Sequence, residues 1–333
     1  MYPLGYVTVK IHTRLIAEHD VTAAQSSSRF DRTTRYPDTE GRMTDAKRAA
    51  DRVQSGFDAL SELYYRYWGE HFHLAIAEHG DDPADLDERY EQTHRRYFNA
   101  IDGQSRKRIL EVACGGGAFA AWLADRTKAE VVGIDRSESQ LRHARQTYLS
   151  EARPNLCFRR EDAMELGRLS EPLFDAAVCL DAACYFPDRP AVIAGVAKML
   201  EPEGRFLLVD WCQSAAPTPL QRELILQPLC RLWGIQRLET VAGYERNFMT
   251  AGFRVQHADL SEATSFNWER GYRVALGALT QPLRGLVRPV SYLALHGVNP
   301  RRLAKDQFQV ALLAKAAADA GVLRYVAFTA IRR

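Results

Sequence analysis

The chain has 333 residues, 46% of them hydrophobic, and a formal net charge of +2. This length and apolar content allow a large buried core, and the nearly balanced charge excludes an overall field that would attract nucleic acid or a membrane surface. The six cysteines include no Cys-x-x-Cys pair, which argues against a disulfide framework or zinc site and favours reduced thiols in a cytoplasmic protein.

The N-terminal 42 residues differ from the rest of the chain. They are polar and without periodicity, so we expect a disordered, dispensable extension that an upstream start codon could explain. They also lack the continuous apolar core of a signal peptide, and no apolar run in the chain approaches the roughly 18–20 residues of a membrane span.

A helical cap is predicted over residues 43–102. Thr44 can cap its first helix, which Gly69 ends after apolar residues at helical spacing. A second helix is expected from Asp82-Pro83 to about residue 100, with proline at a tolerated first-turn position.

From residue 103 onward, short apolar runs alternate with helical stretches. This alternation indicates parallel strands with helical crossovers, hence an α/β domain with a doubly wound, Rossmann-like sheet over 103–333. The expected strands are 108–113, 130–135, 155–160, 174–180, 204–210, 253–259 and a last one in VLRYVAFTAIR. The expected helices are 117–127, 137–150, 188–200, 218–235 and several across 267–320.

The first of these strands runs into a glycine-rich turn, Ala113-Cys114-Gly115-Gly116-Gly117. Glycines let backbone N–H groups and the following helix N-terminus approach a ligand closely, and open parallel sheets bind ligands at this edge. A nucleotide-like cofactor is therefore expected. The spacing also satisfies the dinucleotide pattern G-x-G-x-x-G/A, which leaves an NAD(P)-dependent oxidoreductase as an alternative.

Acidic residues accompany three successive strands. Glu111 can accept from an ammonium group, Asp135 from ribose hydroxyls and Asp162 from an adenine amino group. S-adenosylmethionine carries all three groups, whereas a dinucleotide does not need the first acid.

The chain resembles the class I S-adenosylmethionine-dependent methyltransferases over about residues 50–333. The matching segments are ILEVACGGG, VVGIDRSESQL, RREDAMEL, FDAAVCLDAACYFPD and GRFLLVDW, and one departure is Ala113, where many members have glycine. The resemblance implies a seven-stranded sheet of order 3-2-1-4-5-7-6 with the last strand antiparallel. It also implies cofactor contacts from Glu111, Ala113, Cys114, Gly115, Gly117, Asp135, Arg136, Gln140, Asp162, Ala163 and Leu180.

An aromatic segment, YYRYWGEHFH over residues 64–73, bears on the methyl acceptor. It resembles the W-G-x-x-x-H segment of sterol C-methyltransferases and tocopherol methyltransferases. A wall of such residues suits a flat apolar substrate, so Tyr67, Trp68 and Phe72 are expected to bind it. His71 and His73 could deprotonate a phenol or stay neutral toward an amine. Two histidines separated by one residue, without a third ligand, predict no metal site.

A second segment, LDAACYFPD over residues 180–188, supplies the expected base. Carbon-methylating relatives typically have glutamate where Asp181 stands. A methylated alkene becomes a carbocation and must lose a proton, which a carboxylate at this position can accept. Tyr185 is expected to line the substrate, under helical lid insertions at about 212–250 and 265–320. Trp211, Trp233, Trp268 and Tyr272 are further lining candidates, although core packing explains each of them as well.

We therefore expect a methyltransferase of secondary metabolism, with carbon methylation of an isoprenoid or related lipophilic molecule only slightly favoured over O- or N-methylation. A cofactor-binding but non-catalytic partner is a further alternative. No nucleic-acid partner and no membrane insertion are expected, and formation of a homo-oligomer stays open. Nine Lys and Arg residues against two Asp after residue 281 fit a solvated helix face or an anionic group on the substrate.

Overall fold

A computed structural model describes residues 65, 70–71, 73–77, 86–168, 173–268 and 300–333, with the backbone alone over 300–308. The predicted extension over 1–42 and almost all of the first cap helix lie outside the described residues. None of the described helices is long and apolar enough to cross a membrane.

The described chain alternates strands and helices in the predicted order. Its strands are β1 (Arg108–Val112), β2 (Glu130–Asp135), β3 (Leu156–Arg160), β4 (Phe174–Leu180), β5 (Leu200–Gln213), β6 (Glu239–Thr240), β7 (Phe253–Asp259) and β8 (Leu323–Arg332). Its α-helices are α2 (Leu86–Ala100), α3 (Ala118–Arg126), α4 (Glu138–Tyr148), α5 (Arg189–Met199), α6 (Pro219–Gln221), α7 (Gln227–Trp233), α8 (Val241–Thr250) and α11 (Pro300–Asp319). Shorter turns are η2 (Gly103–Ser105), η3 (Ala163–Arg168), η4 (Ala183–Tyr185) and the π-helical η5 (Arg222–Leu226).

The sheet has the order β3-β2-β1-β4-β5-β8-β7 in the part of the chain described. Strands β1 to β5 are parallel, and β8 runs antiparallel between β5 and β7. This confirms the predicted seven-stranded order, because the two-residue β6 pairs beside the end of β5 and only shifts the numbering of the last strands.

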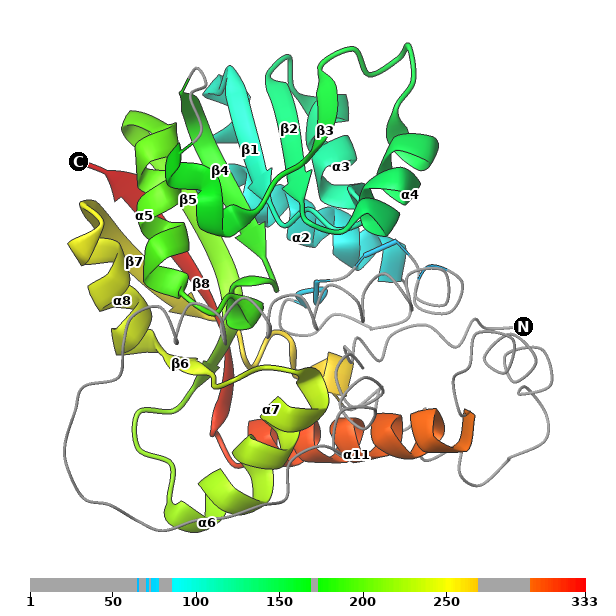
Figure 1. Ribbon diagram of the computed structural model, residues 1–333, viewed down its shortest axis with the longest axis vertical. Coiled ribbons are helices and arrows are strands. Elements are labelled where there is room, and N and C mark those ends of the chain that lie inside the picture. Colours follow the sequence, from blue (N-terminus) through cyan, green and yellow to red (C-terminus); the bar gives the residue numbers. More distant parts are fainter. Residues whose placement is uncertain (1–64, 66–69, 72, 78–85, 169–172, 269–299) are drawn as a thin grey trace, which may run out of the picture.

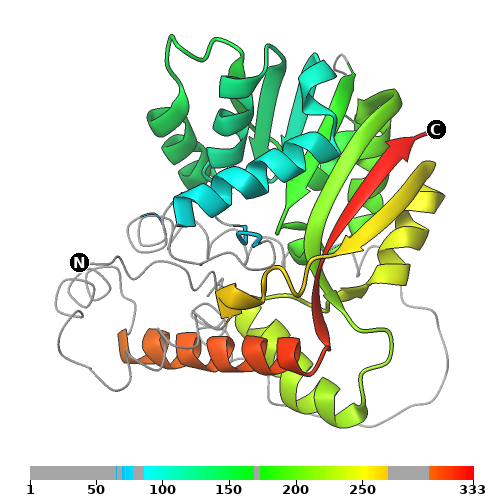
Figure 2. The same ribbon diagram turned by 180° about the vertical axis from the view of Figure 1, so that it is seen from behind.

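Helices cover both faces of the sheet (Figures 1 and 2). One buried cluster joins α2, α3 and α4 to the strand residues that point toward them, for example Phe119 against Val131. The other joins η3, α5 and α8 to the alternate strand residues, for example Val192 and Phe206. Burial on both faces explains why the central strands read as continuous apolar runs instead of alternating ones.

Beyond the carboxyl end of the sheet lie α6, α7 and α11 (Figures 1 and 2). The helix predicted over 218–235 is interrupted by η5, since Pro228 lacks the N–H that an α-helix needs at that point. The helix α8, within the first expected lid insertion, instead belongs to the core cluster beside the sheet. Residues 269–299 of the second insertion lie outside the described part.

Ala113 adopts a left-handed backbone conformation, with φ of 57°. A side chain with a Cβ pays roughly 1–2 kcal/mol for this conformation, whereas glycine adopts it freely. The departure from glycine at this position is thus a local strain in the turn that follows β1.

Ala113→Gly should therefore raise the free energy of unfolding by about 0.5–1 kcal/mol, because the relieved strain exceeds the added chain entropy of glycine. Denaturant titration measures it. Ala118→Gly is the matched control: Ala118 is also half-buried but opens α3 in a helical conformation, so its replacement should not stabilise the protein. A destabilised Ala113→Gly protein would contradict the strain assignment.

Candidate functional site

The glycine turn between β1 and α3 is packed closely against the rest of the protein. Gly117 has φ of 81°, and a Cβ there would lie 2.5 Å from the Phe158 ring. A Cβ on Gly116 would lie 2.5 Å from the hydroxyl of Tyr65. Conformation and close approach together therefore require glycine at these two positions.

Glu111 lies at the end of this turn's strand and is 4% exposed. Burial raises the pKa of its carboxyl to about 8, the charge of Asp135 adds to the rise, and a hydrogen bond from the Ala120 N–H opposes it. Its Oε2 atom has no hydrogen-bond partner among the described residues. A buried carboxylate oxygen without a partner is costly, which makes this atom a ready acceptor for a cationic donor.

Asp135, at the end of β2, holds the glycine turn in place. Its two carboxylate oxygens accept from the Gly115 N–H and from the Ser137 N–H, both at 2.9 Å. A carboxylate accepts up to about four hydrogen bonds, and these two come from backbone N–H groups.

Asp162 follows β3 and already has two partners. It accepts from the Met164 N–H at 2.9 Å at the start of η3 and pairs with the Arg136 guanidinium at 3.3 Å. Asp162 thus stabilises the turn before η3 and forms an ion pair with Arg136, which is also a predicted cofactor residue. The remaining predicted contacts, Cys114, Gln140, Ala163 and Leu180, lie on the segments that follow β1, β2, β3 and at the end of β4.

Tyr65 is a residue of this site that the sequence did not single out. Its hydroxyl donates to Gln140 Oε1, and its ring stacks on His143 with centroids 3.4 Å apart. The same side chain lies against Gly116. The aromatic run over 64–68 was the only signal, and nothing local in that run distinguishes Tyr65 from its neighbours.

Asp181 follows β4 in a left-handed conformation, with φ of 51°, and is 1% exposed. Its N–H donates to the Val209 carbonyl at 2.9 Å. The buried hydroxyls of Tyr97 and Tyr325 lie close enough that the Asp181 charge raises the pKa of both, after burial as the larger cause. The sequence analysis did not identify either tyrosine, because Tyr97 on α2 and Tyr325 on β8 are far from Asp181 in the sequence and approach it only in the folded chain.

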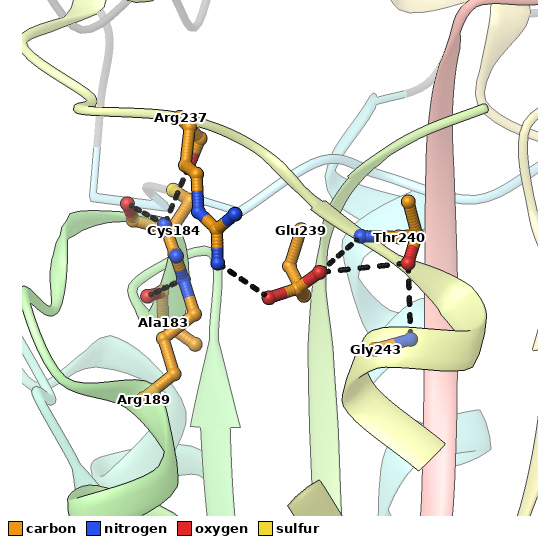
Figure 3. A network of polar contacts seen from close by, with 7 residues as sticks. All are labelled: Ala183, Cys184, Arg189, Arg237, Glu239, Thr240 and Gly243. Atoms are coloured by element: carbon orange, nitrogen blue, oxygen red, sulfur yellow. Dashed lines mark hydrogen bonds and ion pairs between the residues drawn. The ribbon is translucent and has the colours of Figure 1, made fainter. Parts of the chain in front are cut away.

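A buried arginine fixes the chain that follows Asp181. Figure 3 shows Arg189 donating to the carbonyls of Ala183, Cys184 and Arg237, at 3.0, 2.7 and 2.7 Å. The η4 turn, which includes Tyr185, is thereby joined to the segment before β6. In that segment Glu239 accepts from Arg237 at 3.4 Å.

A cavity of about 500 Å³ lies next to Tyr325, at the carboxyl end of β5. Trp211, Trp268 and Tyr325 line it, and the Trp211 ring lies 4.6 Å from Tyr325 and 5.0 Å from Trp268. Its other lining residues are Ser261, Glu262, Thr264, Ser265, Phe266, Lys315, Ala318, Asp319 and Leu323. Trp233 packs behind Trp211 and is buried, so its role is core packing.

His71 and His73 lie in a buried aromatic cluster. The expectation of no metal site rested on the lack of a third ligand, and that premise is wrong, because His94 of α2 lies 2.9 Å from His73 between their Nε2 atoms. The predicted substrate residues Tyr67, Trp68 and Phe72, and also Tyr272, lie outside the described residues. The side chains of the basic residues at 284–305 lie outside them too.

Comparison with known proteins identifies the domain. Residues 109–204 match a protein family described as "Methyltransferase domain". The chain is 28% identical over 241 residues to 27-O-demethylrifamycin SV methyltransferase of Amycolatopsis mediterranei (strain S699), covering 72% of this chain and 87% of that protein. It is 25% identical over 195 residues to cycloartenol-C-24-methyltransferase 1 of Oryza sativa subsp. japonica, covering 58% and 56%.

A solved structure shares the fold: a mycolic acid cyclopropane synthase complexed with S-adenosylhomocysteine superposes with a TM-score of 0.68 at 16% identity, over 85% of this chain and 98% of that one. These similarities favour methyl transfer over the dinucleotide-dependent alternative. With its sheet order and glycine turn, the chain belongs to the class I S-adenosylmethionine-dependent methyltransferases.

Proposed function

We propose that this methyltransferase methylates a carbon atom of an apolar, isoprenoid-type small molecule, with Asp181 as the base. The observation that carries the proposal is the buried Asp181 carboxylate next to Tyr325, which itself lines the aromatic cavity. Tyr325 thus lies next to a proton acceptor and also lines a binding space whose walls are partly aromatic and partly polar.

The residues around the glycine turn fit the cofactor. S-adenosylmethionine supplies a methyl group on a sulfonium, already activated for transfer. Glu111 would bind its ammonium group, which gives the partnerless Oε2 atom a donor and stabilises the charged carboxylate. Asp135, at the end of β2, would accept from the ribose hydroxyls, and Asp162, after β3, would accept from the adenine amino group.

Asp181 would act on the acceptor. An alkene that gains a methyl group becomes a carbocation, and a carboxylate held nearby takes the proton whose loss restores the double bond. The faces of Trp211 and Trp268 would stabilise the positive charge until then. The similarity to a cycloartenol C-24-methyltransferase supports this chemistry. If the substrate also carries an anionic group, the basic residues at 284–305 are the candidates to bind it.

O-methylation is the second candidate. It is favoured by the similarity to 27-O-demethylrifamycin SV methyltransferase over 87% of that protein. In that case the Asp181 carboxylate would take the proton of a hydroxyl group, and the aromatic cavity would hold the rest of a polycyclic acceptor. His71 is a poor base here, because burial lowers the pKa of its imidazole to about 4.

Substitution of the proposed base tests the function. Asp181→Asn should lower kcat at least about 100-fold, the usual contribution of general base catalysis, and leave the Kd for S-adenosylhomocysteine within about twofold. The assay is transfer from methyl-labelled cofactor to isoprenoid alkenes, phenols and hydroxylated polyketides, with the methylated atom located by NMR.

Asp188→Asn is the matched control, since Asp188 caps α5 in the same segment and asparagine caps a helix equally well. This variant should keep wild-type turnover. Asp181→Asn with wild-type turnover would refute the role of Asp181 as a base, and a product methylated on oxygen would refute the carbon-methylation proposal.

The pKa of Glu111 predicts how pH affects cofactor binding. A carboxyl with a pKa of about 8 is largely protonated at pH 6, so the affinity for S-adenosylhomocysteine should rise between pH 6 and 8 as the proton is lost. Glu111→Gln should bind at least about tenfold more weakly at pH 8 and lose this pH dependence. Isothermal titration calorimetry at several pH values measures both.

Glu130→Gln is the control, because Glu130 pairs with Arg108 at the opposite end of the sheet.

The raised pKa of Glu111 also affects the stability of the protein without ligand. Since folding raises the pKa of Glu111 above its unfolded value, the folded state binds the proton more tightly, and stability falls as pH rises from about 4.5 to about 8. Glu111→Gln should remove this loss. Unchanged pH profiles in the variant would contradict the assignment.

A further inference from the structure

Three histidines from two separate segments meet beside the glycine-turn helix. His71 and His73 come from the segment over 70–77, and His94 comes from α2. One nitrogen from each ring lies within 4.8 Å of the others. The ring centroids are 5.0 Å apart for His71 and His94, 5.0 Å for His73 and His94, and 5.8 Å for His71 and His73.

We propose that His71, His73 and His94 bind one zinc-type transition-metal ion. Three imidazoles and no carboxylate in the group suit a borderline ion such as Zn²⁺ and not Mg²⁺ or Ca²⁺, which prefer oxygen ligands. A fourth position would be left for water or a small anion.

The protein already orients these rings. His73 Nδ1 lies 3.1 Å from the Leu74 carbonyl, so it carries the proton and leaves the Nε2 lone pair facing His94. The Tyr90 hydroxyl donates to the His73 carbonyl at 3.1 Å, which fixes the backbone at the same point. A ligand imidazole whose other nitrogen donates to a carbonyl is the usual arrangement at metal sites.

The geometry needs only a small adjustment to take up an ion. Tetrahedral coordination with bonds of about 2.0–2.1 Å separates two nitrogens by about 3.3–3.5 Å. The 2.9 Å between the Nε2 atoms of His73 and His94 must therefore widen slightly as the metal replaces the proton between them. His71 Nδ1 is buried without a hydrogen-bond partner among the described residues, and a metal bond would satisfy this ring.

Aromatic side chains surround the three imidazoles. His73 and His94 are buried, and His71 is half-buried. The Tyr90 ring stacks on His71, with ring centroids 4.1 Å apart. The ring centroids of Phe119 and Trp122 lie 5.0 and 5.2 Å from that of His94.

A metal ion bound by the three histidines would affect the methyl-transfer site by holding Tyr97 in place. Tyr97 lies one turn after His94 on α2, and its ring centroid is 5.8 Å from that of His73. The charge of Asp181 contributes, after burial, to the raised pKa of the Tyr97 hydroxyl. An ion joining the segment over 70–77 to α2 would therefore fix Tyr97 against Asp181. This inference does not depend on the identity of the acceptor.

Metal titration of the full chain tests the proposal. After removal of metals, the protein should bind one Zn²⁺, gain about 4–8 °C in unfolding temperature at a hundredfold excess over Kd, and show no response to Mg²⁺. Co²⁺ in place of zinc should give the intense visible absorption of a tetrahedral site. This spectrum is measured on the unmodified protein and requires no variant to fold.

Variants assign the ligands. His94→Gln and the half-buried His71→Gln should each weaken Zn²⁺ binding at least a hundredfold, whereas His257→Gln, at a surface histidine paired with Glu245, should leave it unchanged. A weak octahedral Co²⁺ spectrum would overturn the proposal. So would Zn²⁺ binding that persists in both His94→Gln and His71→Gln.

Discussion

The structure depends first on two acidic residues beside one glycine turn. Asp135 ties the turn to β2, and its charge adds to the effect of burial that raises the pKa of Glu111 on β1. One carboxyl oxygen of Glu111 has no hydrogen-bond partner in the part of the chain that is described. Burial is the main cause of the raised pKa of Glu111, so this carboxyl favours the protonated form unless a cation joins the site. A cofactor with an ammonium group next to a ribose provides that cation at one carboxylate and hydroxyl donors at the other. In the function we propose, the ligand therefore supplies the counter-charge that Glu111 needs.

The second organising feature lies at the end of β4. Asp181 is buried in a left-handed conformation beside two tyrosine hydroxyls, and the following η4 turn is held by Arg189. Strained backbone and buried charge are tolerated where the surroundings determine the geometry strongly. In this case α2, β5 and β8 all contribute to the surroundings, so the proposed base is positioned by elements from distant parts of the sequence.

Much of the fold could be predicted from the sequence because its strongest signals are local. The strands over 130–135, 174–180 and 253–259 have the predicted bounds. The first two are mainly apolar runs between polar turns. The helix predicted over 218–235 was less accurate, because one proline was enough to convert a turn of it into a π-helix.

The side-chain clusters were beyond local reasoning. Tyr97, Tyr325 and His94 carry no signal in their own segments, since a tyrosine or histidine on a buried helix or strand is usually a packing residue. Their importance comes from which strand or loop the topology places opposite them. The same limit explains why two histidines at 71 and 73 predicted no metal site, since the third histidine of the group lies on α2.

A crystal structure of the protein with S-adenosylhomocysteine tests the central claim most directly. The account predicts the ligand's amino nitrogen within hydrogen-bonding distance of Glu111 Oε2, and its ribose hydroxyls on Asp135. A ligand bound elsewhere, or bound here with Glu111 Oε2 still lacking a partner, would contradict it.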